Sequence, residues 1–173
     1  MKHDEAKNFH KGKKKTGFYD ASIEEAQKNK KADAKLQEVV KGKDMAWEDS
    51  RHGRLKHIVN EKTKARVKTV DMYIQEIPPG GCSGKHRHMA EEFLFVLEGR
   101  GYELHWDVNA RIGEKYTWEV EKEPKRYEWE AGDVIFVPVN TVHQHFNSDP
   151  EKPARLLSGT NRIYKDMGFH DLE

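Results

Sequence analysis

The chain has 173 residues, of which 35% are hydrophobic and 35% charged, and its 31 Lys and Arg almost balance its 30 Asp and Glu. A formal net charge of +1 creates no overall field that would draw the protein to nucleic acid or to an anionic membrane, so neither is expected as a partner. The length is within the usual size of one domain, and the apolar residues are concentrated between Val67 and Ile163. We therefore expect one compact domain with some peripheral structure.

Cys82 is the only cysteine, so no intramolecular disulfide can form and nothing points to an oxidising compartment. The N-terminal stretch MKHDEAKNFHKGKKK is charged, and no apolar signal-peptide core follows it. No window approaches the length of a transmembrane span. We therefore expect a soluble cytoplasmic protein in which Cys82 is a plain loop residue.

The N-terminal part of the chain predicts an arm and a helix. Residues 1–20 are rich in lysine and poor in aliphatic side chains, which is typical of a flexible arm. Ser22 followed by Glu25 forms a capping box, and apolar residues near helical spacing continue to Gly42. These signals predict one amphipathic helix.

The segment AWEDSRHGRLKHIVNEK predicts a connector that ends in a short strand. His52 and His57 lie in this segment, and we expect them to have surface or packing roles rather than to bind a metal. The expected division is therefore an arm, helix and connector over residues 1–64 and a β domain over residues 65–173.

From Ala65 onward the sequence consists of short runs rich in β-branched and aromatic residues, separated by turns such as PPGG, EGRG and EAGD. Many strands at close spacing indicate an all-β sandwich or barrel. The long segment from Arg100 to Ala131 predicts an extra pair of strands that lengthens one edge of the barrel.

The stretch GGCSGKHRHMAEEFLFVLEG places three good metal ligands just before an apolar strand. His86 and His88 are two residues apart, so on a strand both imidazoles point to the same face and can chelate one ion. Glu92 can supply a third ligand, with Glu91 as a rival that strand parity directs outward. His143 and His145 offer a fourth ligand, again two apart on one strand face.

Imidazole and carboxylate together suit divalent Fe, Mn, Co, Ni, Cu or Zn, whereas the lack of thiolate ligands disfavours a closed structural zinc site. We therefore expect one divalent transition metal with an open coordination position for water or substrate.

The first stretch resembles the first motif of the cupin superfamily, G(X)5HXH(X)3,4E(X)6G, with its five positions at Gly80, His86, His88, Glu92 and Gly99. The second stretch resembles the second cupin motif, G(X)5PXG(X)2H(X)3N, through Gly132, Pro138, His143 and Asn147. Asn140 stands where that motif has Gly, and it is one of the few residues that tolerate the left-handed conformation.

The resemblance covers roughly residues 67–164 and implies an all-β cupin jelly-roll barrel, with the N-terminal helix as an extension. It also implies a mononuclear metal held by His86, His88, Glu92 and His143. His145 is then expected beside the metal, as a catalytic acid or base toward the bound substrate. Homodimers are common among cupins, so a homodimer is expected here.

A looser resemblance links HMAEEFLFVLEGRGYELHWD and VPVNTVHQHFN to gentisate-type aromatic-ring dioxygenases, although those enzymes use a His-only shell. This favours an Fe(II)-dependent dioxygenase acting on a small aromatic or enediol substrate. Candidates to hold that substrate, by strand position, are Arg162, Tyr73, Gln75 and Trp106. Fe(II) is thus the favoured metal, and Mn(II), Zn(II), Ni(II) or Cu(II) are possible. Two alternatives stay open: an isomerase or lyase for sugars or keto acids that uses Mn(II), Zn(II) or Ni(II), and a small-molecule-binding cupin without turnover.

Overall fold

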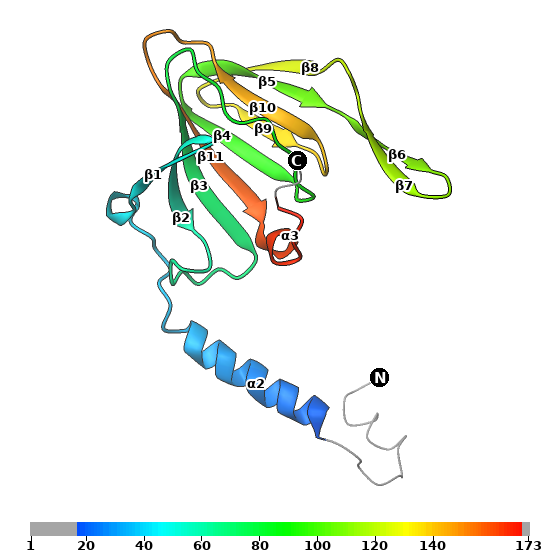
Figure 1. The fold of residues 1–173 in the computed structure, drawn as a ribbon. Coiled ribbons are helices and arrows are strands. Elements are labelled where there is room, and N and C mark those ends of the chain that lie inside the picture. The colour runs from blue at the N-terminus through cyan, green and yellow to red at the C-terminus, as the bar shows by residue number, and fades with distance from the viewer. Residues whose placement is uncertain (1–16, 171–173) are drawn as a thin grey trace. The chain divides into compact units, whose positions relative to one another are not determined.

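A computed structural model describes residues 17–170 of the chain, which divides into two compact units, Met1–Leu36 and Gln37–Glu173 (Figure 1). Most of the basic arm predicted over residues 1–20 lies outside the described residues.

In the first unit, helix α2 spans Phe18–Asp33 and buries none of its side chains. The predicted start at Ser22 is wrong, because this residue lies inside the helix, where its hydroxyl donates to the carbonyl of Tyr19 (2.7 Å). The predicted end at Gly42 is also wrong. The N–H of Leu36 bonds to a carbonyl three residues back, and such tight turns end the α-helix before the later apolar residues are reached.

The second unit consists mainly of two antiparallel sheets (Figure 1). The six-stranded sheet has the order β1-β2-β3-β11-β4-β9, with bounds Trp47–Ser50, Gly53–Val59, Val70–Ile77, Ala154–Asn161, Glu92–Glu98 and Val134–Val137. The three-stranded sheet has the order β10-β5-β8, with bounds Val142–Asn147, Arg100–Trp106 and Lys125–Glu130. The 3-10 helix η2 (Gly42–Asp44) precedes β1, and helix α3 (Arg162–Asp166) follows β11. The predicted all-β class and jelly-roll barrel are thereby confirmed.

The segment predicted as a connector contributes two strands rather than one. Strand β1 pairs with β2, and β2 pairs with β3, so both extend the larger sheet. Gln37 is already tied to this unit, since its N–H bonds to the carbonyl of Lys64 and its carbonyl accepts from the N–H of Arg66. The predicted boundary between residues 64 and 65 therefore falls inside this compact unit.

The two sheets enclose an interior that is apolar at one end and polar at the other. Alternation along β4 is regular, with Glu92, Leu94 and Val96 buried between exposed neighbours. Apolar side chains from both sheets form the core cluster, namely Ile77, Leu94, Val96, Trp129, Ile135, Val137, Ala154 and Leu156. The buried polar side chains include the histidines and carboxylates of the site described below.

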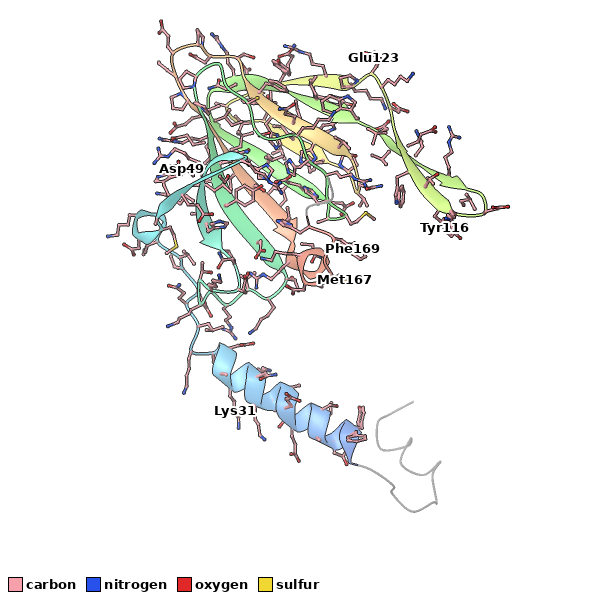
Figure 2. The ribbon with its side chains drawn as sticks, viewed as in Figure 1. Lys31, Asp49, Tyr116, Glu123, Met167 and Phe169 are labelled. Carbon is pink, nitrogen blue, oxygen red and sulfur yellow. The ribbon has the colours of Figure 1, made fainter. Side chains whose placement is uncertain are left out.

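The long segment after β5 forms a separate two-stranded hairpin, β6 (Val108–Ile112) with β7 (Tyr116–Val120), that extends away from the barrel (Figure 1). Tyr116 lies near its far end, and Glu123 lies where the chain returns toward β8 (Figure 2). The expectation that these strands lengthen an edge of the barrel is wrong. Pairs such as Ala110 with Trp118 put the apolar residues of both strands on one face of the hairpin.

Among the described residues, no helix is both long enough and apolar enough to cross a membrane.

Candidate metal centre

Four side chains from three segments of the chain come together at the polar end of the barrel. His86 forms an antiparallel bridge with His143 of β10, through backbone hydrogen bonds of 3.1 and 2.8 Å. His88 follows on the same extended segment, and Glu92 is the first residue of β4. One potential ligand atom from each of these four residues lies within 4.8 Å of the others. The structure thus brings together the four predicted ligands.

The three histidines are oriented in the same way. The Nδ1 atom of His86 lies 3.1 Å from the carbonyl of Gly84, and that of His88 lies 2.7 Å from the carbonyl of Ala90. His143 Nδ1 makes the equivalent bond, of 2.9 Å, to the carbonyl of residue 141. A carbonyl oxygen only accepts, so each Nδ1 carries the proton and each neutral ring keeps the lone pair of Nε2 available for a metal.

Glu92 presents its two oxygens to different partners. Oε1 accepts from the hydroxyl of Tyr73 (3.1 Å) and, in a very short contact, from the hydroxyl of Ser158. Oε2 lies 3.2 Å from Nε2 of His88 and 3.5 Å from Nε2 of His143. Glu91 is exposed, as strand parity predicts.

The electrostatics of the cluster favour an ionised carboxylate among largely neutral imidazoles. Burial opposes ionisation of Glu92, but the neighbouring rings of His143 and His88 outweigh it and hold the Glu92 pKa well below its usual value. Burial lowers the pKa of His143, and burial together with the charge of His143 lowers that of His86 to about 2. For His88, burial lowers the pKa, but the Glu92 carboxylate outweighs burial and raises it.

These residues fit a divalent metal. His143 Nε2 is a buried polar atom without a hydrogen-bond partner, which is costly unless something else satisfies it. A cation among the three Nε2 atoms and Oε2 of Glu92 would satisfy it. Cys82 is exposed and outside this cluster, so the donors are nitrogen and oxygen only, a set that suits several divalent transition metals.

His145 lies next to this cluster and outside the set of four, with its ring centroid 5.4 Å from that of His143. Its Nδ1 is 3.3 Å from Oε2 of Glu103, a fully buried carboxylate on β5. The other oxygen of Glu103 accepts from Nε2 of His105 at 2.8 Å. Glu103 therefore lies between two imidazoles inside the barrel.

The charge balance of this second group follows from the same contacts. Burial opposes ionisation of Glu103, but His145 and His105 outweigh it and lower the Glu103 pKa to about 2. Burial lowers the pKa of His145, and the Glu103 carboxylate more than reverses this. The contact therefore favours the ionised form of Glu103 and raises the affinity of His145 for a proton.

Sequence reasoning missed Glu103, His105 and the position of His52. His52 lies in the tight turn between β1 and β2, and its ring centroid is 4.3 Å from that of His86. Burial and the charge of Arg51 lower its pKa to about 4. His52 thus packs against His86, which is a candidate metal ligand. His57 is partly exposed, and its Nε2 lies 2.7 Å from the carboxylate of Glu48.

The four candidates for holding a substrate, for each of which the sequence favours a packing or surface role, differ in where they lie. Tyr73 supports Glu92, and the buried Gln75 donates to the carbonyl of His52 (2.6 Å) while its Oε1 is without a hydrogen-bond partner. Arg162 is anchored outside the cluster by Asp71 (2.6 Å).

The fourth, Trp106, is stacked under the ammonium group of Lys85 (3.7 Å). Its side chain alternates with that of His105 along β5, so the two lie on opposite faces of the strand.

Asn140 has φ +61°, the left-handed conformation for which the second motif uses Gly. Its N–H bonds to the carbonyl of His88 (2.9 Å), and its side-chain oxygen accepts from Arg87 (3.2 Å). The turn before β10 is thereby tied to the segment that carries His86 and His88.

Several known proteins are similar to this chain. Auxin-binding protein T92 of Nicotiana tabacum is 27% identical over 96 residues, which covers 56% of this chain and 48% of that protein. The chain thus spans about half the length of the curated relatives it matches.

Two solved structures share the fold. Oxalate decarboxylase of Lactobacillus farciminis has a TM-score of 0.56 at 20% identity, covering 76% of this chain and 34% of that chain. The polyketide cyclase RemF of Streptomyces resistomycificus has a TM-score of 0.53 at 18% identity, covering 73% of this chain and 80% of that chain. At these identities the likeness concerns the fold alone.

Residues 73–159 match the cupin domain family, and this range contains both motifs and all four clustered residues. Together with the antiparallel barrel, this match shows that the chain belongs to the cupin family.

Proposed function

We propose that this cupin is a mononuclear non-haem Fe(II) dioxygenase that acts on a small aromatic or enediol substrate. The proposal rests on the donor set, three imidazoles with Nε2 available and one buried carboxylate. Bound Fe(II) would supply the one-electron chemistry that such a substrate needs to react with O₂. His86, His88, Glu92 and His143 would hold it.

The chain's own residues would position the reacting groups. The hydroxyls of Tyr73 and Ser158 hold Oε1 of Glu92, which leaves Oε2 toward the ring nitrogens. His145 is our candidate acid or base toward the substrate, because it is buried beside the cluster and oriented by Glu103. A cytoplasmic location, which the lone cysteine supports, is part of the proposal.

A lyase or isomerase that uses the same four ligands is the second candidate. Its support is the likeness to an oxalate decarboxylase and to a polyketide cyclase. There the metal would act as a Lewis acid on a carbonyl group, and no O₂ would be consumed. The relation to an auxin-binding protein supports a third reading, a cupin that binds a small molecule and leaves it unchanged.

Elemental analysis of anaerobically purified protein, followed by O₂-electrode assays with catechols and gentisate, separates these candidates. Iron together with substrate-dependent O₂ uptake is the expected result. Zinc, nickel or manganese with no uptake would contradict the dioxygenase and favour the second candidate.

The role of His145 has its own test. His145→Ala is expected to keep the metal and to lower kcat by roughly 10²–10⁴-fold, the usual contribution of a positioned acid or base. His57→Ala, at a partly exposed position on β2, is the matched control and is expected to change neither. Loss of metal from the His145 variant would instead make His145 a ligand.

A further inference from the structure

A cleft opens between strands β8 and β9, which follow each other in the chain but belong to different sheets. The turn between them is closed by two bonds, from Asp133 N–H to the carbonyl of Glu130 (3.0 Å) and from Glu130 N–H to the Asp133 carboxylate (2.9 Å). Beyond this turn the strands diverge, because each is the edge strand of its own sheet. The resulting cavity has a volume of about 470 Å³, which is within the range of small-molecule sites.

The walls of this cleft are mainly aromatic and apolar. They include Tyr127 and Trp129 of β8, Ile135 and Phe136 of β9, and Pro138. Trp129 is almost fully buried, whereas Tyr127 is 47% exposed. Walls of this kind favour a flat apolar ring over a sugar or a free phosphate.

The imidazole and carboxylate side chains that line the cleft are His105, Glu128 and Asp133. The carboxylate of Asp133 accepts from a backbone N–H of the turn, and that of Glu128 accepts from Arg126 (2.6 Å). What His105 can offer a ligand depends on its own hydrogen bonding. His105 is 5% exposed, and its Nε2 donates to the ionised Glu103 at 2.8 Å. In a neutral ring bonded in this way, Nδ1 is an acceptor. Among the described residues, no hydrogen bond to that Nδ1 is formed, so His105 can accept one from a hydroxyl group of a ligand.

The cleft also lies close to the metal-binding cluster. His105 of β5 is directly opposite His143 of β10 in the strand register, and their ring centroids are 6.3 Å apart. The ring of Tyr127 is 5.1 Å from that of His105 on the cleft side. Only the imidazole ring of His105 therefore separates a molecule bound in the cleft from His143, a candidate metal-coordinating residue.

We propose that the β8–β9 cleft binds a hydroxylated aromatic ring, with its hydroxyl donating to His105 and its ring lying against Tyr127. Glu103 is the positioning residue for His105. Binding in the cleft is independent of the metal, and only the turnover of that ligand rests on the proposed function.

The binding test uses the full chain stripped of metal with a chelator, titrated with catechol and followed by ligand-detected NMR. Catechol is expected to bind, and Tyr127→Ala is expected to weaken its binding about tenfold. Tyr116→Ala removes a tyrosine of the β6–β7 hairpin that is 79% exposed and outside the cleft, so it is the matched control and is expected to have no effect. Equal affinity in wild type and Tyr127→Ala would overturn the proposal.

A second pair of variants tests the hydrogen bond. His105→Phe is expected to weaken catechol binding about tenfold while leaving toluene binding unchanged, since toluene has no hydroxyl to donate. Glu103→Gln should keep most of the catechol affinity because its amide oxygen can still accept from His105, whereas Glu103→Leu should lose it. Equal losses for catechol and toluene in His105→Phe would mean that His105 has only a packing role, which contradicts the proposed recognition.

The same variants separate this proposal from the dioxygenase. Catechol binding that depends on Tyr127, without any O₂ uptake by the iron-loaded protein, would support the cleft and contradict the dioxygenase. Catechol-dependent O₂ uptake whose KM is unchanged in Tyr127→Ala and His105→Phe would overturn the cleft and leave the dioxygenase standing.

Discussion

At the scale of single residues, the geometry of the candidate metal centre depends on hydrogen bonds that set the direction of each donor. Three imidazoles are oriented through Nδ1 by backbone carbonyls, and the carboxylate of Glu92 is oriented by two hydroxyls. These hydrogen bonds restrict the rotation of the ligand side chains before a metal binds. Substitution of a ligand, or of a residue that holds a ligand in place, should therefore lower metal affinity.

The first prediction concerns the ligands themselves. His86→Ala and His88→Ala should each remove nearly all metal, because each deletes one of four donors and leaves an incomplete site. Metal content per chain, measured by elemental analysis after gel filtration, checks this. His57→Ala is the control at a partly exposed position. Equal metal content in all three variants would contradict the assigned site.

The second prediction concerns a support of Glu92. Tyr73→Phe removes the hydroxyl that donates to Oε1 but keeps the ring, so metal affinity should fall by roughly 10–100-fold without loss of the fold. Competition with a chromophoric chelator measures the affinity. Tyr164→Phe, on helix α3, is a control in which no change is expected. Unchanged affinity in Tyr73→Phe would mean that Ser158 alone is sufficient to orient Glu92.

At the scale of elements, strand β5 is constrained by how closely β10 and β8 approach it. Gly101 lies opposite Asn147 of β10 and Trp129 of β8. A Cβ atom at Gly101 would overlap the carbonyl oxygen of Phe146 and the ring of Trp129. The backbone oxygen belongs to a paired strand and cannot move aside, so this position requires glycine for space rather than for its backbone conformation.

The third prediction follows from this close approach. Gly101→Ala should lower the free energy of unfolding by about 1–3 kcal/mol or more, the typical cost of overpacking a core. Gly113→Ala in the β6–β7 turn meets only the carbonyl oxygen of Lys115 at 4.0 Å and should change stability by less than about 0.5 kcal/mol. Urea denaturation followed by circular dichroism compares the two variants. Equal stability would show that β10 can shift away from β5.

At the scale of the whole molecule, the outer face of the larger sheet exposes many apolar side chains. The exposed members on β4 and β9 are Phe93, Phe95, Leu97, Val134 and Phe136. Apolar patches of this kind commonly mark surfaces that associate with another protein. The homodimer expected from the sequence stays a prediction, and this face is where we expect the second copy to bind.

The fourth prediction tests that association. Light scattering should give a mass near twice the 20.2 kDa of one chain for the wild type, and a lower mass for Phe95→Glu. Ile112→Glu, at a 78% exposed site on the β6–β7 hairpin, is the control that should stay dimeric. A monomeric wild type would refute the homodimer.

Sequence reasoning located the clustered residues but missed Glu103 and His105, for a physical reason. Along β5, Gly101, Glu103 and His105 share one face, and the apolar residues between them share the other. Burial rules assign the apolar face to the interior. At the polar end of this barrel the assignment is reversed, because the polar face contacts the histidine cluster, and only the tertiary structure reveals this.

The sequence by itself determined the all-β fold and the two motifs whose histidines and glutamate form the cluster. These depend on local periodicity, because the alternation of side chains along a strand sets which residues within a short stretch share a face. Only the tertiary structure decided which distant strands lie side by side. The His86–His143 bridge, the contact of His145 with Glu103, the packing of His52 on His86 and the cleft between β8 and β9 all depend on register and sheet membership. Those are set by packing across the barrel, which no short stretch of sequence encodes.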